Sequence, residues 1–181
     1  MRRLTGSAFA ALLVGCATGG ARPAADPVPE PATPAASVTS IYSAGMTFGA
    51  TRDGVVRRLG TPGRITAEPE PNRHDASLTD TIRTLYYDDL TFTFLEAGGS
   101  GREFLVEVDA IGARPPLPGL AIGRSTRGEI VAALGEPQRL DTIADTLALA
   151  YATPGEGAED VVALLTVADV LRRVRWAPYV D

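Results

Sequence analysis

The chain contains no lysine, so all 17 of its basic residues are arginines, and it has a single histidine (His74) and a single cysteine (Cys16). Without lysine, neither Schiff-base chemistry nor a Walker-type phosphate loop is available. One cysteine cannot form an internal disulfide, and one histidine with one cysteine cannot make a zinc site. A net charge of −5 at pH 7 argues against nucleic-acid binding, which depends on a basic surface. We therefore predict no cofactor, no metal ion and no nucleic-acid partner.

The N-terminus has the pattern of a secretory signal peptide. Two arginines at positions 2 and 3 precede a short apolar segment, residues 4–14. A helix needs roughly 20 residues to span a bilayer, so this segment is too short to cross one and suits a cleaved signal instead. We predict a signal peptide at residues 1–15.

The apolar segment ends in Leu-Val-Gly-Cys16, which resembles the lipobox of bacterial lipoproteins. In that family the cysteine receives a diacylglycerol, the signal is cut before it and the new N-terminus is acylated, which gives stable anchoring. The resemblance implies that Cys16 is lipidated and that the lipid bilayer is a partner. Ala17 stands where inner-membrane lipoproteins of this kind carry aspartate, which implies an outer-membrane protein facing the periplasm of a bacterial envelope. The alternative is an ordinary cleaved signal with an incidental cysteine.

The segment after the cysteine is rich in proline and alanine. Residues 17–37 hold five prolines and almost no large apolar side chains. Such a segment cannot bury enough apolar surface to fold and favours an extended, polyproline-like conformation. We predict that residues 16–37 are the lipidated cysteine and a disordered tether.

The remaining sequence contains an internal repeat. Residues 51–64 (TRDGVVRRLGTPGR) align with residues 126–139 (TRGEIVAALGEPQR) at seven identical positions. Residues 80–86 (DTIRTLY) align with residues 145–151 (DTLALAY), which pairs Tyr86 with Tyr151. The first copy has a longer loop, predicted at residues 66–79. We predict two tandem units, residues 38–112 and 113–181.

Each unit is predicted to have an α+β fold, with a short helix followed by about three antiparallel strands and the helices layered on the sheet. The helices begin at Thr51 and Thr126, where Thr126 and Glu129 form a capping-box pattern, and end at left-handed caps on Gly60 and Gly135. Residues 90–94 and 104–108 alternate with a period of two. This alternation predicts two strands with apolar residues on one face (Leu90, Phe92 and Phe94; Phe104, Val106 and Val108).

The repeat resembles the SmpA/OmlA lipoproteins and the tandem units of β-lactamase inhibitor proteins. The residues that carry the resemblance are Gly45-Met46-Thr47, Thr51, Val55, Leu59-Gly60-Thr61-Pro62 and Tyr86, then Gly119, Thr126, Ile130, Leu134-Gly135-Glu136-Pro137 and Tyr151. The resemblance implies an antiparallel sheet layered with helices and used for protein–protein contact in the envelope. The chain departs from these families in having two units where small assembly lipoproteins have one, and no disulfide where the secreted inhibitors have them.

Few residues in the chain are candidates for chemistry. His74 and Asp75 could activate a serine, but no nucleophile-elbow motif is present, so we interpret them as solvated loop residues. Asp88 and Asp89 could form a carboxylate pair for acid–base chemistry or bind Ca²⁺. Adjacent side chains in a strand or turn point apart and do not share a site, so we interpret the two residues as a hairpin turn. We predict no catalytic residue and no enzyme.

Five residues near the C-terminus are candidates for contact with a partner: Arg172, Arg173, Arg175, Trp176 and Tyr179. Arginine binds carboxylates in a bidentate manner, and aromatic residues are frequent interface anchors. The alternative for the arginines is a solvated face balanced by acids such as Glu107 and Asp109. Core packing is the expectation for Tyr86 and Tyr151.

The sequence therefore predicts a lipid-anchored envelope protein whose duplicated domain binds another protein, as a scaffold or assembly factor. One alternative is an inhibitor that docks onto an exported enzyme such as a hydrolase. A further alternative is an unrecognised hydrolase.

Overall fold

The computed structural model describes residues 36–153 and 161–178, which belong to one compact unit, Thr33–Asp181. These residues form the helices α1 (Val38–Met46), α2 (Arg52–Leu59) and α3 (Arg127–Leu134), and the strands β1 (Arg64–Pro71), β2 (Thr79–Tyr86), β3 (Leu90–Glu96), β4 (Glu103–Ala110), β5 (Arg139–Ile143), β6 (Thr146–Ala152), β7 (Val161–Val167) and β8 (Val170–Ala177). None of the helices in these ranges is long and apolar enough to span a membrane. The predicted signal peptide, Cys16, nearly all of the tether and Tyr179 lie outside the described residues.

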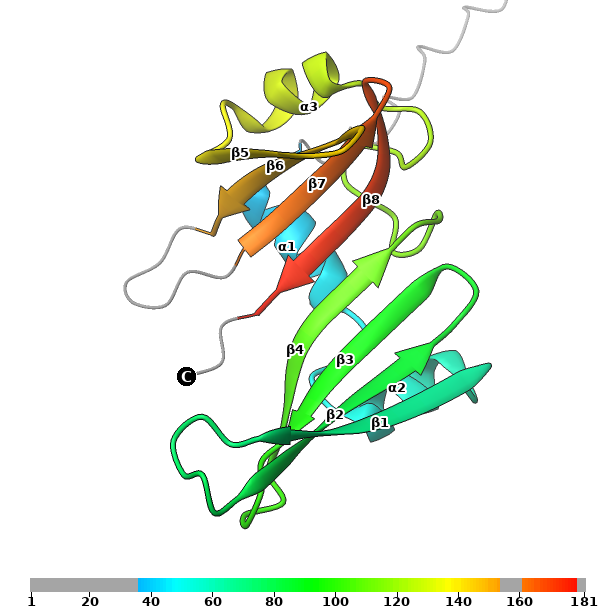
Figure 1. Cartoon of the computed structure of the whole chain (residues 1–181). Helices are drawn as coiled ribbons and strands as arrows, with labels where there is room; N and C mark the ends of the chain where they lie inside the picture. The colour runs from blue at the N-terminus through cyan, green and yellow to red at the C-terminus, as the bar shows by residue number, and fades with distance from the viewer. Residues whose placement is uncertain (1–35, 154–160, 179–181) are drawn as a thin grey trace, which may run out of the picture. The chain divides into compact units, whose positions relative to one another are not determined.

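All eight strands join in one antiparallel sheet with the order β1-β2-β3-β4-β8-β7-β6-β5 (Figure 1). The predicted fold of two units, each a helix with about three strands, is therefore wrong. Four strands follow α2 and four follow α3, and β4 pairs with β8 so that the strands form a single sheet. Helix α1, which precedes α2, was also not predicted.

The strands that the sequence did not predict are the two edges of the sheet. Most of β1, from residue 66 on, lies within residues assigned to a loop, and the strand contains Pro69 and Pro71. Proline is tolerated in an edge strand because its missing N–H would have no partner on the outer side. β5 is only five residues long and mostly exposed, so it lacks the apolar alternation by which a strand is recognised.

The starts of α2 and α3 follow the predicted capping chemistry. The Thr51 hydroxyl accepts a hydrogen bond from the backbone N of Gly54 at 3.2 Å. Thr126 and Glu129 form the full reciprocal box, in which the Thr126 backbone N donates to the Glu129 carboxylate at 2.7 Å. The prediction of a capping box in the second copy alone is confirmed.

Both helices end at a glycine with positive φ. Gly60 has φ 82° and ψ −169°, and Gly135 has φ 83° and ψ −173°. The predicted left-handed cap is correct in the sign of φ but wrong in ψ, because this extended region is essentially open only to glycine. The chain therefore leaves each helix in an extended conformation, and the next strand begins four residues after the glycine, at Arg64 and at Arg139.

Two tyrosines, one directly after β2 and one near the end of β6, hold these helix ends. The Tyr151 hydroxyl donates to the Gly135 carbonyl at 3.1 Å, and the Tyr87 hydroxyl donates to the Gly60 carbonyl at 3.0 Å. Tyr87, and not Tyr86, is thus the counterpart of Tyr151, which corrects the sequence alignment by one residue. Tyr151 is buried, as predicted, whereas Tyr86 is partly exposed beneath the Arg64 guanidinium.

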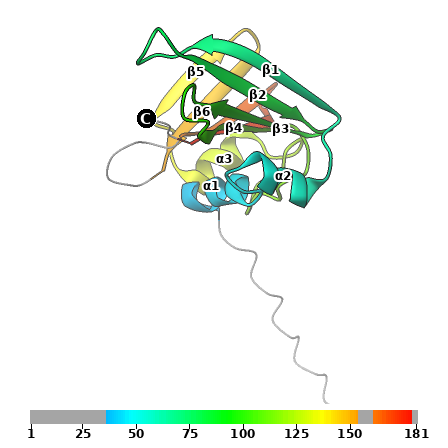
Figure 2. The same ribbon diagram turned by 90° about the horizontal axis from the view of Figure 1, so that it is seen from below.

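The core lies between the three helices and the face of the sheet that they cover (Figures 1 and 2). Trp176 is fully buried there, and its indole N–H donates to the Ile41 carbonyl at 2.9 Å. Gly45 of α1 lies directly against the indole ring. The prediction that Trp176 is a contact residue is corrected, because its side chain has no exposed surface.

The join between β4 and β8 is short and charged. It contains three residue pairs, with Asp109 opposite Arg175 in the middle. Arg175 donates to Asp109 at 3.1 Å, Arg173 lies 3.3 Å from the same carboxylate, and Arg175 lies 3.4 Å from Glu107. Arg173 and Arg175 are thus balanced by Glu107 and Asp109, the acids named in the alternative interpretation of these arginines as a solvated face.

Candidate functional site

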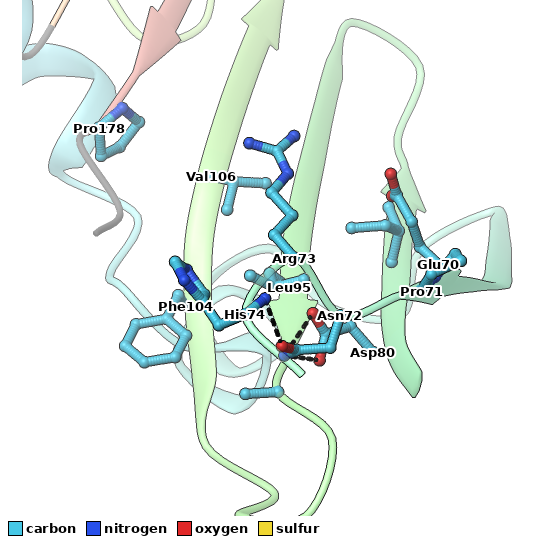
Figure 3. A pocket seen from close by; sticks show the side chains of 12 residues that line it. Glu70, Pro71, Asn72, Arg73, His74, Asp80, Leu95, Phe104, Val106 and Pro178 are labelled. Atoms are coloured by element: carbon cyan, nitrogen blue, oxygen red, sulfur yellow. Dashed lines mark hydrogen bonds between the residues drawn. The ribbon is translucent and has the colours of Figure 1, made fainter. Parts of the chain in front are cut away.

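A hollow of about 540 Å³ lies on the face of the sheet opposite the helices, which we call the open face (Figure 3). The end of β1, with Glu70, and the loop between β1 and β2, with Asn72, Arg73 and His74, form its rim. Apolar side chains from three neighbouring strands and the end of β8 form its floor: Ile82, Leu95, Phe104, Val106 and Pro178. The volume falls within the range of ligand and peptide pockets.

Two residues of the floor face the hollow because of an irregularity between β3 and β4. The register shifts between Thr93 and Phe94, so that Phe94 pairs with Leu105 while Phe92 pairs with Val108. A β-bulge of this kind re-aims the side chains on one side of it. The prediction that Phe104, Val106 and Val108 share a face is therefore wrong. Val108 is fully buried in the core, whereas Phe104 and Val106 line the hollow.

The rim is held in place by Asn72 and Asp80. The Asn72 side-chain amide donates to both oxygens of the Asp80 carboxylate at 2.9 and 3.1 Å, and the Gly98 backbone N donates to it at 2.8 Å. These hydrogen bonds, that of Asn72 first, hold the pKa of Asp80 below its usual range. The side-chain oxygen of Asn72, Oδ1, in turn accepts hydrogen bonds from the backbone N–H groups of His74 and Asp75. Asp80, which is only 7% exposed, thus anchors the loop over the sheet.

The geometry around His74 does not form a catalytic relay. The Asp75 carboxylate accepts hydrogen bonds from both the backbone N and the hydroxyl of Ser77, at 2.9 and 2.7 Å. These bonds lower the pKa of Asp75 and tie its carboxylate to a local turn. His74 is exposed at the rim, in agreement with the interpretation as a loop residue.

The charge at the rim is divided between its two sides. Figure 3 shows Arg73 and His74 on the side of Phe104 and Val106, with Glu70 on the other side. The Arg73 guanidinium forms no ion pair or hydrogen bond with another described residue. The Arg102 guanidinium lies 5.1 Å from the centre of the Phe104 ring. The hollow therefore offers an apolar floor beside a cation that is free to bind.

A second hollow of about 240 Å³ is acidic and internally paired. Asp88 and Asp89 border it in a tight turn that is closed by a hydrogen bond from the Tyr87 backbone N to the Leu90 carbonyl at 2.8 Å. Hydrogen bonds from Arg114 hold the pKa of Asp89 below its usual range. Across the described part of the chain, no group of three or more His, Cys, Asp or Glu is placed to hold a metal ion. The tight turn at Asp88 and Asp89 agrees with the hairpin turn predicted for these two residues.

The structure separates the residues predicted to contact a partner. Arg172 is exposed, Arg173 and Arg175 pair with acids on β4, Trp176 lies in the core, and Tyr179 is not among the described residues. The hollow was missed because its floor depends on the bulge in β4. One signal could have indicated it, since the loop that forms the rim is the segment present in only one copy of the repeat.

No protein-family model and no curated protein sequence matches this chain. Among solved structures it is similar to a DUF4309 family protein (YjgB) from Bacillus subtilis, with 14% sequence identity and a TM-score of 0.47. The match covers 78% of this chain and 95% of that protein.

Proposed function

We propose that this protein is a lipid-anchored cell-envelope protein that binds another protein through the open face of its sheet, in a scaffold or assembly role. The observation that carries the proposal is the hollow on that face, with its apolar floor and the guanidinium of Arg73, which pairs with no other described residue. Protein interfaces combine a water-excluding apolar centre with a few oriented polar groups at the edge. Binding, rather than catalysis, is the activity that this arrangement supports.

The charges near the hollow favour an acidic partner segment with a large apolar side chain. Arg73 and Arg102 are cations on the Phe104 side of the floor, with Glu70 on the other side, in a chain whose net charge is −5. Local positive charge on an acidic protein directs an acidic segment to one place and repels it elsewhere. The apolar side chain would lie on Phe104 and Val106, and its acidic neighbour would pair with Arg73.

The proposed location in the envelope, at the outer membrane and facing the periplasm, rests on the lipobox resemblance at Cys16 and on the resemblance of the repeat to SmpA/OmlA lipoproteins. The full chain, expressed in a double-membraned bacterium, is expected to sediment with membranes and to carry acyl mass in intact-protein mass spectrometry. Cys16→Ala is expected to abolish both. A wild-type protein found in the soluble fraction without acyl mass would overturn the anchoring proposal.

Site-specific photocrosslinking tests the binding face. A benzophenone amino acid at Phe104 samples the hollow, and the same group at Ile65, which is 56% exposed and projects from the helix-covered side of β1, is the matched control. We expect a protein adduct from position 104 that Arg73→Glu weakens, and none of the same mass from position 65. A membrane-associated assembly complex as the adduct supports a scaffold, and a single soluble exported enzyme supports the inhibitor alternative. Adducts that form equally from both positions would contradict a role for the hollow.

A further inference from the structure

The two edges of the sheet are protected to different degrees. β1 carries two glutamates and two prolines in its second half, at residues 68–71. Charges and prolines on an edge strand prevent the exposed backbone from pairing with another chain. β5, at the other edge, has no proline, and its two charged residues have opposite signs. Only one edge of this sheet therefore has strong protection against strand addition.

β5 also exposes apolar side chains. Leu140 is 47% exposed and Ile143 is 74% exposed, and both belong to the small group of large apolar side chains on the described surface. β5 pairs with β6 along one side, and as the last strand of the sheet its other side carries backbone N–H and C=O groups available to a further strand. An added strand would satisfy these groups and, with Leu140 of one strand opposite Leu140 of the other, would cover this apolar side chain.

The sequence of β5 is complementary to itself. If two copies of β5 run antiparallel with Leu140 opposite Leu140, Arg139 of each copy lies opposite Asp141 of the other. Sliding one strand by two residues would instead set Asp141 against Asp141, which is unfavourable because like charges directly opposite destabilise a strand pair. Arg139 and Asp141 now pair within one chain at 2.6 Å, with side chains 72% and 44% exposed, so the same charges are free to exchange partners.

We propose that β5 pairs antiparallel with β5 of a second copy of this chain and extends the sheet across a two-fold axis. The β4–β8 join is an antiparallel pairing of the same kind within one chain, with Asp109 opposite Arg175 at its centre. The dimer leaves the hollow free, because the rim of the hollow is formed by β1 at the opposite edge. The proposal is independent of which partner the hollow binds.

The test is the mass of the full chain, purified in detergent and measured by light scattering after size exclusion. We expect two chains for the wild type. Arg139→Glu and Asp141→Arg should each weaken dimerisation about tenfold or more, because each places two pairs of like charges across the axis. The double variant Arg139→Glu/Asp141→Arg should restore the dimer, since it restores opposite charges on both sides.

A matched pair of variants separates this edge from the other. Leu140→Lys should give a monomer, whereas Ile65→Lys, at the corresponding position of β1 and 56% exposed, should leave the dimer unchanged. Circular dichroism confirms that each variant is folded. A monomeric wild type would overturn the proposal, as would equal effects at the two edges. Failure of the double variant to recover the dimer would overturn the pairing.

Discussion

The packing of α1 against Trp176 predicts that Gly45→Ala destabilises the protein, although alanine is the better helix former. In an exposed helix the change from glycine to alanine is favourable by about 0.8–1 kcal/mol. At Gly45 a Cβ atom would stand 2.5–2.6 Å from three atoms of the Trp176 indole. These contacts are far inside van der Waals distance, and overpacking of a core costs about 1–3 kcal/mol.

The two effects oppose each other, and the steric cost is the larger. With mid-range values for both effects we expect a net loss of about 1 kcal/mol in the free energy of unfolding, which lowers the urea midpoint by about 0.5 M for a protein of this size. Gly128→Ala in α3 is the matched control, because its nearest contact would be the Thr126 hydroxyl at 4.0 Å. This variant should be slightly more stable than the wild type. Urea titrations followed by circular dichroism measure both changes.

A Gly45→Ala variant as stable as the wild type would refute the reasoning, provided that Gly128→Ala shows its expected gain. Such a result would mean that α1 does not press on the indole. A second variant tests the contact directly, since Trp176→Phe removes part of the ring that the new methyl group meets. The cost of Gly45→Ala should be smaller in the Trp176→Phe background than in the wild type.

Two further changes have outcomes that follow from the hydrogen bonds described above. Tyr151→Phe removes the bond to the Gly135 carbonyl and should cost about 0.5–1.5 kcal/mol in urea unfolding, more than Tyr87→Phe, whose equivalent bond is exposed; a larger loss at Tyr87 would contradict this. Asp80 has a lowered pKa in the folded state, so its contribution is present above the unfolded value of about 3.9 and is lost as the pH falls through the folded pKa. Urea midpoints between pH 2 and 6 should therefore depend less steeply on pH in Asp80→Asn than in the wild type, and an equally steep dependence would contradict a contribution of Asp80.

The parts of the fold that could be predicted are those set by neighbouring residues. Helix caps at Thr51 and Thr126 are local chemistry, because hydroxyl and backbone lie within one turn of each other. The alternation along β3 likewise indicates one face that is buried throughout. The apolar residues on that face, Leu90, Phe92 and Phe94, are all in the core. Such features depend little on the rest of the chain.

The parts that could not be predicted depend on pairing between distant segments. Whether β4 joins β8 is decided by residues 66 positions apart, such as Asp109 and Arg175, and no local pattern reports it. The bulge opposite Thr93 and Phe94 changes the face of Phe104 and Val106 without changing their sequence pattern. The candidate site was therefore hidden for the same reason that the single sheet was.

The position of α1 has a mechanical consequence. α1 is the first helix of the described chain, and it supports Trp176, which lies in one of the three pairs that join β4 to β8. A pulling force that enters from the N-terminal side meets α1 before any strand. Peeling α1 away would uncover the indole and leave its N–H without the Ile41 carbonyl, at the point where the two halves of the sheet have the fewest shared bonds. If the proposed lipid anchor at Cys16 holds the chain, tension would therefore act first on the helix that covers Trp176, at the join between the two halves of the sheet.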